Sequence, residues 1–304
     1  MLDALTLDQL RVLVAVAETG SFSAAARRLG RVQSAISQAI QSLESTLATK
    51  LFDRRARTPV LTDAGRVLLV DARHLLRGAE ILRARAESFA AGVEPELTLV
   101  VDAVFPNAVL VASLKELSLA FPHLPVTLFT EGLGGTEQRL RDGVARLGIY
   151  PPMRGVAADL EAEFLAAIPM VPVVAADHPL AAAPSPVTRE ELERHVQLVL
   201  TDRTQLSAGI MGNIMSIKIW RFADLTSRLD YLLAGFGWCY MPAHMVAEDI
   251  AGGRLKRLDI KEHRGRVFEF PMHIVHERGR VPGRAGRWLL DNLRQRLAAE
   301  TPAS

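Results

Sequence analysis

The stretch SFSAAARRLGRVQSAISQAIQSLESTLATKLFDRRARTPVLTDAG, residues 21–65, decides how the first part of this chain folds. Ser23 can cap a short, alanine-rich helix that ends at Leu29-Gly30, and another helix follows after a tight connection. This second helix carries an apolar stripe at helical spacing, formed by Ile36, Ile40, Leu43 and Leu47. Two helices joined by a glycine-containing turn predict a helix-turn-helix.

A helix before this pair and a hairpin after it complete the predicted domain. Thr6 and Gln9 form a capping box at the start of a helix whose apolar residues recur at helical spacing. After the pair, Leu51-Phe52 and Val60-Leu61 can form a small hairpin around a basic tip. Residues 1–61 are therefore predicted to form an all-α winged helix-turn-helix domain.

The exposed face of the second helix of the pair has almost no charge. It consists of hydroxyl and amide side chains, namely Gln33, Ser34, Ser37, Gln38 and Gln41. Glutamine can bond adenine through two hydrogen bonds in the major groove, and serine can contact a base or a phosphate. Lysine in their place would add sequence-independent affinity. The face therefore predicts base reading, and the alternative is a merely soluble helix surface.

Positive charge is concentrated near the hairpin. The whole chain has a net charge of only +2, so any nucleic-acid binding must come from a local concentration of charge. Four basic residues gather here, namely Lys50, Arg54, Arg55 and Arg57. Arginines on a hairpin tip can follow phosphates or enter a narrow minor groove, and the alternative is a solvated run of charge.

A long helix is predicted over residues 62–91. Thr62 can cap it, and Asp63 favours its positive N-terminal end. Its apolar residues follow one another in steps of four and three, as Leu68, Ala72, Leu75, Ala79, Leu82, Ala86 and Phe89. Such a heptad seam predicts a linker helix that dimerises through Leu68, Leu75, Leu82 and Phe89. The alternative is a helix that lies on its own domain.

Alternating strands and helices are predicted for residues 92–304. The segments LTLVVDAVF, VTLFTEG and ARLGIY are typical of strands, and a second set of elements begins near Glu161. This alternation predicts an α/β fold with a mostly parallel sheet. We expect two similar subdomains with a cleft between them, subdomain I at about 92–160 and 267–304 and subdomain II at about 161–266.

Residues 21–65 resemble the DNA-binding domain of the LysR-type transcriptional regulators, including Leu51-Phe52 and Arg54 at the start of the wing. The segment LLAGFGWCYMPAHMVAEDIAGGRLKRL, residues 232–258, is similar to the family's pattern of a helix that ends in glycine before a strand and a proline. The resemblance covers nearly the whole chain. It implies a dimerising linker helix and a periplasmic-binding-protein-like effector domain of two α/β subdomains.

For the DNA-binding domain, the resemblance implies that four side chains face bases or phosphates in the major groove, namely Gln33, Ser34, Ser37 and Gln38. Arg54 would lie near the minor groove or its phosphates, and Ser23 near the DNA backbone. The chain has Arg31-Val32 where the family most often has Val-Ser, so Arg31 is expected to contact the DNA backbone instead of a hydroxyl. Ala48-Thr49 replaces the family's usual glycine-containing turn.

For the effector domain, the resemblance implies a ligand between the subdomains, close to Asp102, Phe105, Thr130, Thr201, Arg203, Thr204 and Phe222. Arg203 can add a charge-assisted pair to an acidic ligand. Asp102 would repel such a ligand, so a cationic, amide or aromatic ligand is as consistent as an acid. Phe105, Phe129 and Phe222 would supply apolar walls, or they belong to the plain core.

The resemblance implies a homo-oligomeric regulator of transcription, a dimer or a tetramer, that is controlled by a small-molecule effector. Paired recognition helices predict an interrupted palindrome in double-stranded DNA. RNA polymerase is a further expected partner. The alternative is a DNA-binding protein whose second half serves only oligomerisation.

No enzyme, cofactor or metal site is predicted. The sequence has no G-x-S-x-G elbow, P-loop or complete dinucleotide fingerprint. His273 and His276 would point to opposite faces of a strand, which does not suit a metal. Cys239 is the only cysteine, and we interpret it as a small buried hydrophobe rather than a redox sensor.

The expected location is the cytoplasm, without a membrane anchor. The apolar stretches are shorter than the roughly 20 residues that span a bilayer. The N-terminus MLDALTLDQL has no signal-peptide pattern, and a lone cysteine fits a reducing compartment.

Overall fold

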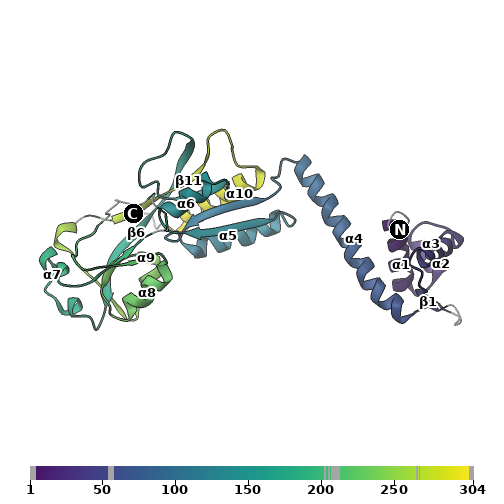
Figure 1. Ribbon diagram of the computed structural model, residues 1–304, viewed down its shortest axis with the longest axis horizontal. Coiled ribbons are helices and arrows are strands. Elements are labelled where there is room, and N and C mark those ends of the chain that lie inside the picture. Colours follow the sequence, from purple (N-terminus) through teal and green to yellow (C-terminus); the bar gives the residue numbers. More distant parts are fainter. Residues whose placement is uncertain are drawn as a thin grey trace. The chain divides into compact units, whose positions relative to one another are not determined.

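The computed structural model describes residues 5–53, 58–201, 203, 204, 206, 213–264, 266 and 268–300. The chain divides into two compact units, Met1–Ala90 and Ala91–Ser304 (Figure 1). The first unit contains four helices and a hairpin among its described residues, namely α1 (Leu7–Thr19), α2 (Phe22–Arg28), α3 (Gln33–Thr46), β1 (Phe52–Asp53), β2 (Val60–Leu61) and α4 (Asp63–Ala90).

Side-chain caps set the starts of α1 and α2 in the first unit. The predicted capping box of α1 is confirmed, since Thr6 and Gln9 each bond the other's backbone N–H. The prediction that Ser23 caps α2 is wrong. The cap is Ser21, whose hydroxyl accepts a hydrogen bond from the Ala24 N–H, because the helix begins two residues earlier than its alanine run suggested.

The core of the first unit is built around α3. Its predicted stripe of Ile36, Ile40 and Leu43 is fully buried. The stripe packs with side chains from α1, α2, the start of the wing and α4, namely Leu10, Val12, Leu13, Val16, Ala25, Ala26, Leu51, Phe52, Leu69 and Ala72. The predicted hairpin is confirmed as a two-stranded antiparallel ladder in which Phe52 pairs with Leu61.

A buried carboxylate fixes the start of the wing. Glu44 of α3 is almost fully buried, and its Oε1 accepts hydrogen bonds from the Leu51 and Phe52 N–H groups at 2.9 and 3.3 Å. Its Oε2 accepts one from the Lys50 ammonium at 2.9 Å. Burial raises the pKa of Glu44, but Lys50 and the two amides outweigh it, so the pKa lies below its ordinary value.

The first turns of α4 lie on its own unit. Thr62 caps the helix as predicted, accepting a hydrogen bond from the Gly65 N–H at 2.9 Å. Gly65 is required here, because a Cβ would lie 2.2 Å from the Leu51 carbonyl oxygen. Ala72 is buried and Leu68 half-buried against the core around α3.

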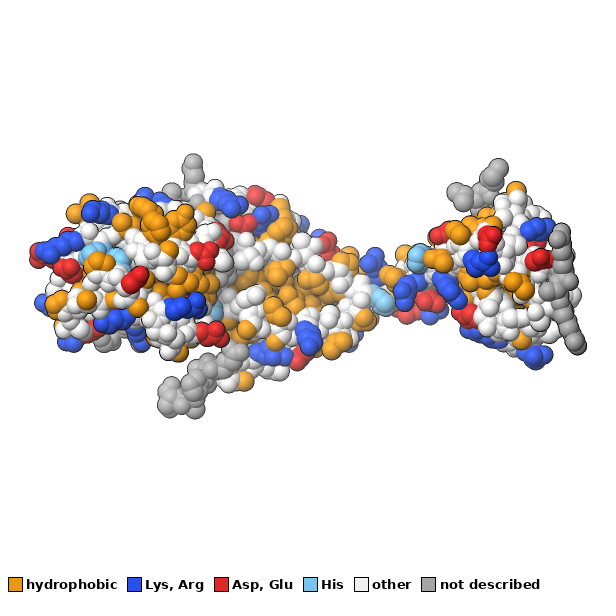
Figure 2. All heavy atoms as spheres, turned by 90° about the horizontal axis from the view of Figure 1, so that it is seen from below, with side chains coloured by type: hydrophobic (Ala, Val, Ile, Leu, Met, Phe, Trp, Pro, Cys, Tyr) orange, Lys and Arg blue, Asp and Glu red, His pale blue; other side chains and the backbone are white. Residues whose placement is uncertain are grey.

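The predicted heptad seam is therefore divided along α4. Its first part packs within the unit, which agrees with the alternative interpretation. Three later members, Leu75, Leu82 and Phe89, are 53%, 71% and 48% exposed. Basic, acidic and hydrophobic side chains lie together on the surface of α4 (Figure 2).

The second unit is a mixed sheet covered by helices (Figure 1). Its strands are β3 (Leu97–Asp102), β4 (Val126–Glu131), β5 (Leu147–Tyr150), β6 (Leu160–Ala175), β7 (Gln197–Leu200), β8 (Ile219–Phe222), β9 (Trp238–Pro242), β10 (Leu255–Arg257) and β11 (Phe268–Glu277). Its helices are α5 (Asn107–Ala120), α6 (Gly134–Arg141), η2 (Pro179–Ala182), α7 (Arg189–Glu193), α8 (Leu225–Leu233), α9 (Ala243–Ala251), η3 (Lys261–His263) and α10 (Arg284–Glu300).

The prediction of a mostly parallel sheet holds only within each half. The strand order is β4-β3-β5-β11-β6-β9-β7-β8, with β10 paired to β6. β3 runs parallel to β4 and β5, and β7 runs parallel to β8 and β9. β6 and β11 run antiparallel to their neighbours, because one long strand carries the chain into the second half and the other carries it back.

Helices cover the two halves separately. α10 packs on α5 in the first half, where the rings of Phe121 and Trp288 meet edge to face at 6.1 Å. α8 and α9 pack against strands of the second half (Figure 1). Within the described residues, we find no helix whose length and apolar character would let it cross a membrane.

Replacing Glu44 by Gln should destabilise the first unit by about 1–3 kcal/mol at pH 7. The neutral side chain loses the ion pair with Lys50, and it is a weaker acceptor than a carboxylate for the buried Leu51 N–H. The folded-state pKa of Glu44 is lowered, so its carboxylate stabilises the fold above pH 4.5, and this contribution is lost as the pH falls through the folded-state pKa. Urea unfolding followed by circular dichroism should show the difference between wild type and Glu44→Gln shrinking toward acid pH.

The control is Glu87→Gln, which alters an exposed acid on α4. It should change the free energy of unfolding little at any pH. A Glu44→Gln protein as stable as wild type at pH 7 would contradict the role of the carboxylate.

Candidate functional site

The polar face of α3 lies opposite its buried stripe. Four of the five predicted base-reading side chains are exposed and one is half-buried, namely Gln33, Ser34, Gln38 and Gln41, with Ser37 half-buried. The structure thus brings all five together on one surface of the helix. Packing fixes this arrangement, because turning α3 to bury the amides would expose Ile36, Ile40 and Leu43.

Ser23 contributes to this surface through Gln33. The Ser23 hydroxyl donates a hydrogen bond to Gln33 Oε1 at 2.8 Å, which joins the first turn of α2 to the first turn of α3. The bond restricts the rotamers of Gln33 before DNA binds. Sequence reasoning assigned Ser23 a cap and a DNA-backbone contact, and it missed this bond between side chains ten residues apart.

Arg31 is held in the connection between α2 and α3. Its guanidinium forms a two-pronged pair with Asp8 of α1, with both distances 2.7 Å. The Arg31 hydrogen bonds lower the pKa of the Asp8 carboxyl and outweigh its partial burial. Both side chains are exposed, so the guanidinium is positioned at the surface and a DNA phosphate would compete with Asp8 for it.

The N-terminus of α3 has no side-chain cap. Val32 occupies the cap position, and it makes no capping hydrogen bond. The backbone N–H groups of the first turn therefore face outward, where helix N-termini favour anions such as phosphate. The predicted wing residues Arg54, Arg55 and Arg57 lie outside the described residues.

A cavity lies between the two halves of the second unit. It measures about 110 Å³. Loops and strands of both halves line it, with Val104, Leu133 and Met153 from the first half, Met170, Phe268 and Phe270 from the crossing strands, and Gln197, Leu198, Val199, Leu200, Asn213, Ile214, Arg228 and Tyr240 from the second half. Its walls are mostly apolar, as is usual for small-molecule sites.

The predicted effector residues do not line this cavity. Asp102 is fully buried and accepts hydrogen bonds from the Val104 and Leu133 N–H groups at 2.9 and 3.0 Å. Burial raises its pKa to about 6 against the effect of these two amides. Asp102 therefore fixes two loops that carry lining residues, while its own side chain is not among those that line the cavity.

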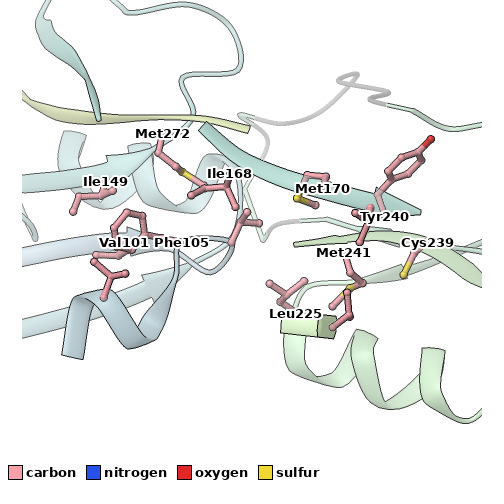
Figure 3. Packing of buried hydrophobic residues seen from close by; sticks show 14 of the residues in the cluster. Val101, Phe105, Ile149, Ile168, Met170, Leu225, Cys239, Tyr240, Met241 and Met272 are labelled. Carbon is pink, nitrogen blue, oxygen red and sulfur yellow. The ribbon is translucent and has the colours of Figure 1, made fainter. Parts of the chain in front are cut away.

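Phe105 is also corrected, from a cavity wall to a core residue. It is buried and packs among the side chains that include Val101 and Ile149 (Figure 3). Its backbone N–H donates to the Asp102 carbonyl at 2.9 Å, and its side chain is not among those that line the cavity.

The remaining predicted effector residues are spread over two strand ends. Thr130 is exposed on the edge strand β4. Thr201 follows β7 and donates its N–H to the Phe222 carbonyl at 2.7 Å, so these two are neighbours. The Phe222 ring packs on Tyr231 at 5.0 Å, outside the cavity. Arg203 is exposed and Thr204 half-buried in a segment whose residue 202 lies outside the described residues.

Arg228 and Gln197 were missed by sequence reasoning. Gln197 spans the cavity floor, donating to the Asn213 carbonyl and accepting from the Met215 and Ser216 N–H groups. Arg228 is buried on α8 beside Leu225 and Leu232. A charged residue that shares a helical stripe with two leucines is a signal that the sequence did contain.

Cys239 is fully buried in β9. Burial raises the pKa of its thiol to about 11, so the reactive thiolate is scarce at neutral pH. These features favour a small core residue over a redox sensor.

Family comparisons agree with this geometry. Residues 7–66 match the model of the bacterial regulatory helix-turn-helix protein of the lysR family, and residues 90–298 match the LysR substrate binding domain. The chain belongs to the LysR family of bacterial transcriptional regulators. It has the predicted α/β fold with an N-terminal helix-turn-helix DNA-binding domain and a C-terminal effector-binding domain.

Curated relatives are regulators of the same type. The chain is 35% identical to the probable HTH-type transcriptional regulator YhaJ of Escherichia coli over 83% of this chain and 85% of that protein. It is 31% identical to the HTH-type transcriptional regulator AceR of Acinetobacter baumannii over 97% of this chain and 98% of that one.

Solved structures share the fold. A mutant of OxyR from Corynebacterium glutamicum matches with a TM-score of 0.62 at 23% identity, covering 98% of this chain and 97% of that chain. LysG from the same organism, solved with its effector Arg bound, matches with a TM-score of 0.51 at 19% identity and covers 97% and 99%.

Replacing Gln33 and Ser37 by Ala should lower the ratio of operator affinity to random-DNA affinity. Each two-bond contact to a base that is lost should cost roughly 1–3 kcal/mol of discrimination between the two DNAs. The operator would first be selected from a random library, and both affinities measured by fluorescence anisotropy at fixed salt. Arg31→Ala is the contrasting variant, since a lost phosphate contact should weaken both affinities alike. An unchanged ratio in the first variant would remove the base-reading role.

Proposed function

We propose that this regulator reads an interrupted palindrome through α3 and that a small molecule bound in the cavity of the second unit controls it. The observation that carries this proposal is that the cavity takes its lining from both halves of that unit. A ligand that contacts both halves binds one relative arrangement of them more tightly than another. It therefore shifts the population toward that arrangement.

Self-association through α4 is the second part of the proposal. Leu75, Leu82 and Phe89 recur every seven residues and stay exposed, while the first turns of the helix, with Leu68 and Ala72 of the same seam, pack on its own unit. A heptad stripe on a 28-residue helix suits a second copy of the same helix. Pairing two chains would present two α3 helices, which suits an operator with two half-sites.

A second apolar surface supports a tetramer. Val111 and Leu119 of α5 and Val126 and Leu128 of β4 are exposed. Figure 2, which views the side on which α5 lies in Figure 1, shows hydrophobic side chains gathered over this part of the second unit. We place association of the effector domains here.

RNA polymerase and a cytoplasmic location complete the proposal. Both are supported by the relatives, which are named as transcriptional regulators. A regulator of this kind acts through DNA and polymerase contacts, so we assign it no catalytic step.

Replacing both Leu75 and Leu82 by Glu should yield monomers, because like charges would face each other across the seam. Static light scattering measures the mass in solution. Val144→Glu, at an exposed hydrophobic residue of the second unit, is the control and should leave the mass unchanged. An oligomer that survives the double replacement would refute the seam.

A thermal-shift screen of small metabolites on the full chain should find a ligand that raises the melting temperature, by an amount that grows with ligand concentration. Met153→Trp fills the cavity from its rim and should abolish the shift. Val156→Trp, three residues away and outside the cavity lining, should keep it. If no compound in a broad library raises the melting temperature, a regulator without an effector is favoured.

A further inference from the structure

Arg228 is a buried cation in the cavity. It lies on α8 and is 5% exposed. Its Nη2 donates a hydrogen bond to the Tyr240 carbonyl oxygen at 2.9 Å and lies 3.3 Å from Met241 Sδ. Its Nε is buried and has no hydrogen-bond partner among the residues that the structure describes. Met241 of β9 and Leu225 of α8 lie near each other between the sheet and the helix (Figure 3).

This guanidinium has no counter-charge in the part of the chain that the structure describes. No described carboxylate forms an ion pair with Arg228, whereas the buried Glu44 is matched by Lys50. Arginine does not lose its proton in proteins, and an unpaired buried charge is costly. An unpaired buried charge at the wall of a cavity is typical of a group whose counter-charge is supplied by a bound ligand.

A second donor without a partner lines the same cavity. Asn213 Nδ2 is buried and makes no hydrogen bond to any residue in the described part of the chain. The other polar side chains of the wall are already engaged, since Gln197 makes three hydrogen bonds and the Tyr240 hydroxyl pairs with His263. Both unmatched groups are donors, so the cavity lacks an acceptor, and the nearby cation favours a negatively charged one.

The remaining lining residues indicate the chemical character of the rest of the ligand. Met153, Met170, Phe268 and Phe270 offer apolar and aromatic contacts. No acid is found among the described lining residues, so an ammonium group would have no counter-charge there. The cavity of about 110 Å³ is somewhat smaller than the ~150 Å³ cavity that holds benzene.

From these observations we infer that the effector is a small organic monocarboxylate without an amino group. Arg228 and Asn213 bind its carboxylate, and its apolar body lies against the methionines and phenylalanines of the wall. This inference rests on the effector control proposed above. A carboxylate offers two acceptor oxygens, which matches two donors without partners. The Arg228 pair would be largely desolvated, which strengthens it.

The test uses the full-length protein and a fixed panel of acids that suit the size of the cavity: propanoate, butanoate and 3-methylbutanoate, each with its primary amide, and isobutylamine as a cation. Isothermal titration calorimetry measures the affinities. At least one acid should bind wild type roughly tenfold or more tightly than its amide, since a charge-assisted bond replaces a neutral one. Arg228→Met should abolish this preference, and Asn213→Asp, which puts a carboxylate in the cavity, should abolish acid binding.

Three results would overturn the inference: binding of the amide or amine as tight as the acid, an acid preference that survives Arg228→Met, or no binding by any acid. If Arg228→Met does not fold, Arg228→Lys replaces it and should weaken acid binding while leaving amide binding unchanged. DNA affinity with and without ligand separates the two proposals. If an acid binds through Arg228 but leaves DNA affinity unchanged, only the effector control is refuted. If a neutral molecule alters the DNA affinity of both wild type and Arg228→Met, only the present inference is refuted.

Discussion

The long antiparallel ladder between β6 and β11 is the constraint on which the second unit depends. It runs from the pair of Leu160 with Glu277 to the pair of Met170 with Phe268, and it continues the sheet of one half into that of the other. The two strands hold the halves together while leaving each with its own parallel strands and helices. They also supply Met170, Phe268 and Phe270 to the cavity wall, so the strands that join the halves also line the cavity. A ligand bound there, as proposed above, would contact the strands that join the halves and so bias their arrangement.

In the first unit the comparable device is the carboxylate of Glu44. It accepts hydrogen bonds from two backbone N–H groups at the turn from α3 into the wing. Because the carboxylate is buried, leaving these groups without partners would cost free energy. Ala48 in the same turn adopts a positive φ of 49°, a conformation that costs energy in a residue other than glycine. The hydroxyl of Thr62 also donates to the Lys50 carbonyl, so hydrogen bonds from α3 and from the start of α4 together fix the start of the wing.

Much of the fold could be predicted because local patterns carry it. The stripe of Ile36, Ile40 and Leu43, the capping box of Thr6 and Gln9, and the cap at Thr62 are features of neighbouring residues, and each was found where expected. The effector site could not be predicted in the same way. Asp102 and Phe105 stand at a strand end, where sequence alone cannot separate a side chain that faces a cavity from one that supports its wall. The buried carboxylate of Asp102 is held in part by the Leu133 N–H, which lies 31 residues away in the sequence.

The sequence by itself determined the two classes of surface. These are a helix face of amides and hydroxyls opposite an apolar stripe, and a long helix with an apolar heptad seam, and both follow from the periodicity of a single helix. Only the tertiary structure decided which polar groups lack partners. Arg31 pairs with Asp8, Ser23 with Gln33 and Lys50 with Glu44, whereas among the described residues the guanidinium of Arg228 bonds a carbonyl oxygen and a sulfur but no carboxylate. Whether a charge is paired depends on what long-range packing brings within about 4 Å, and no local pattern contains that information.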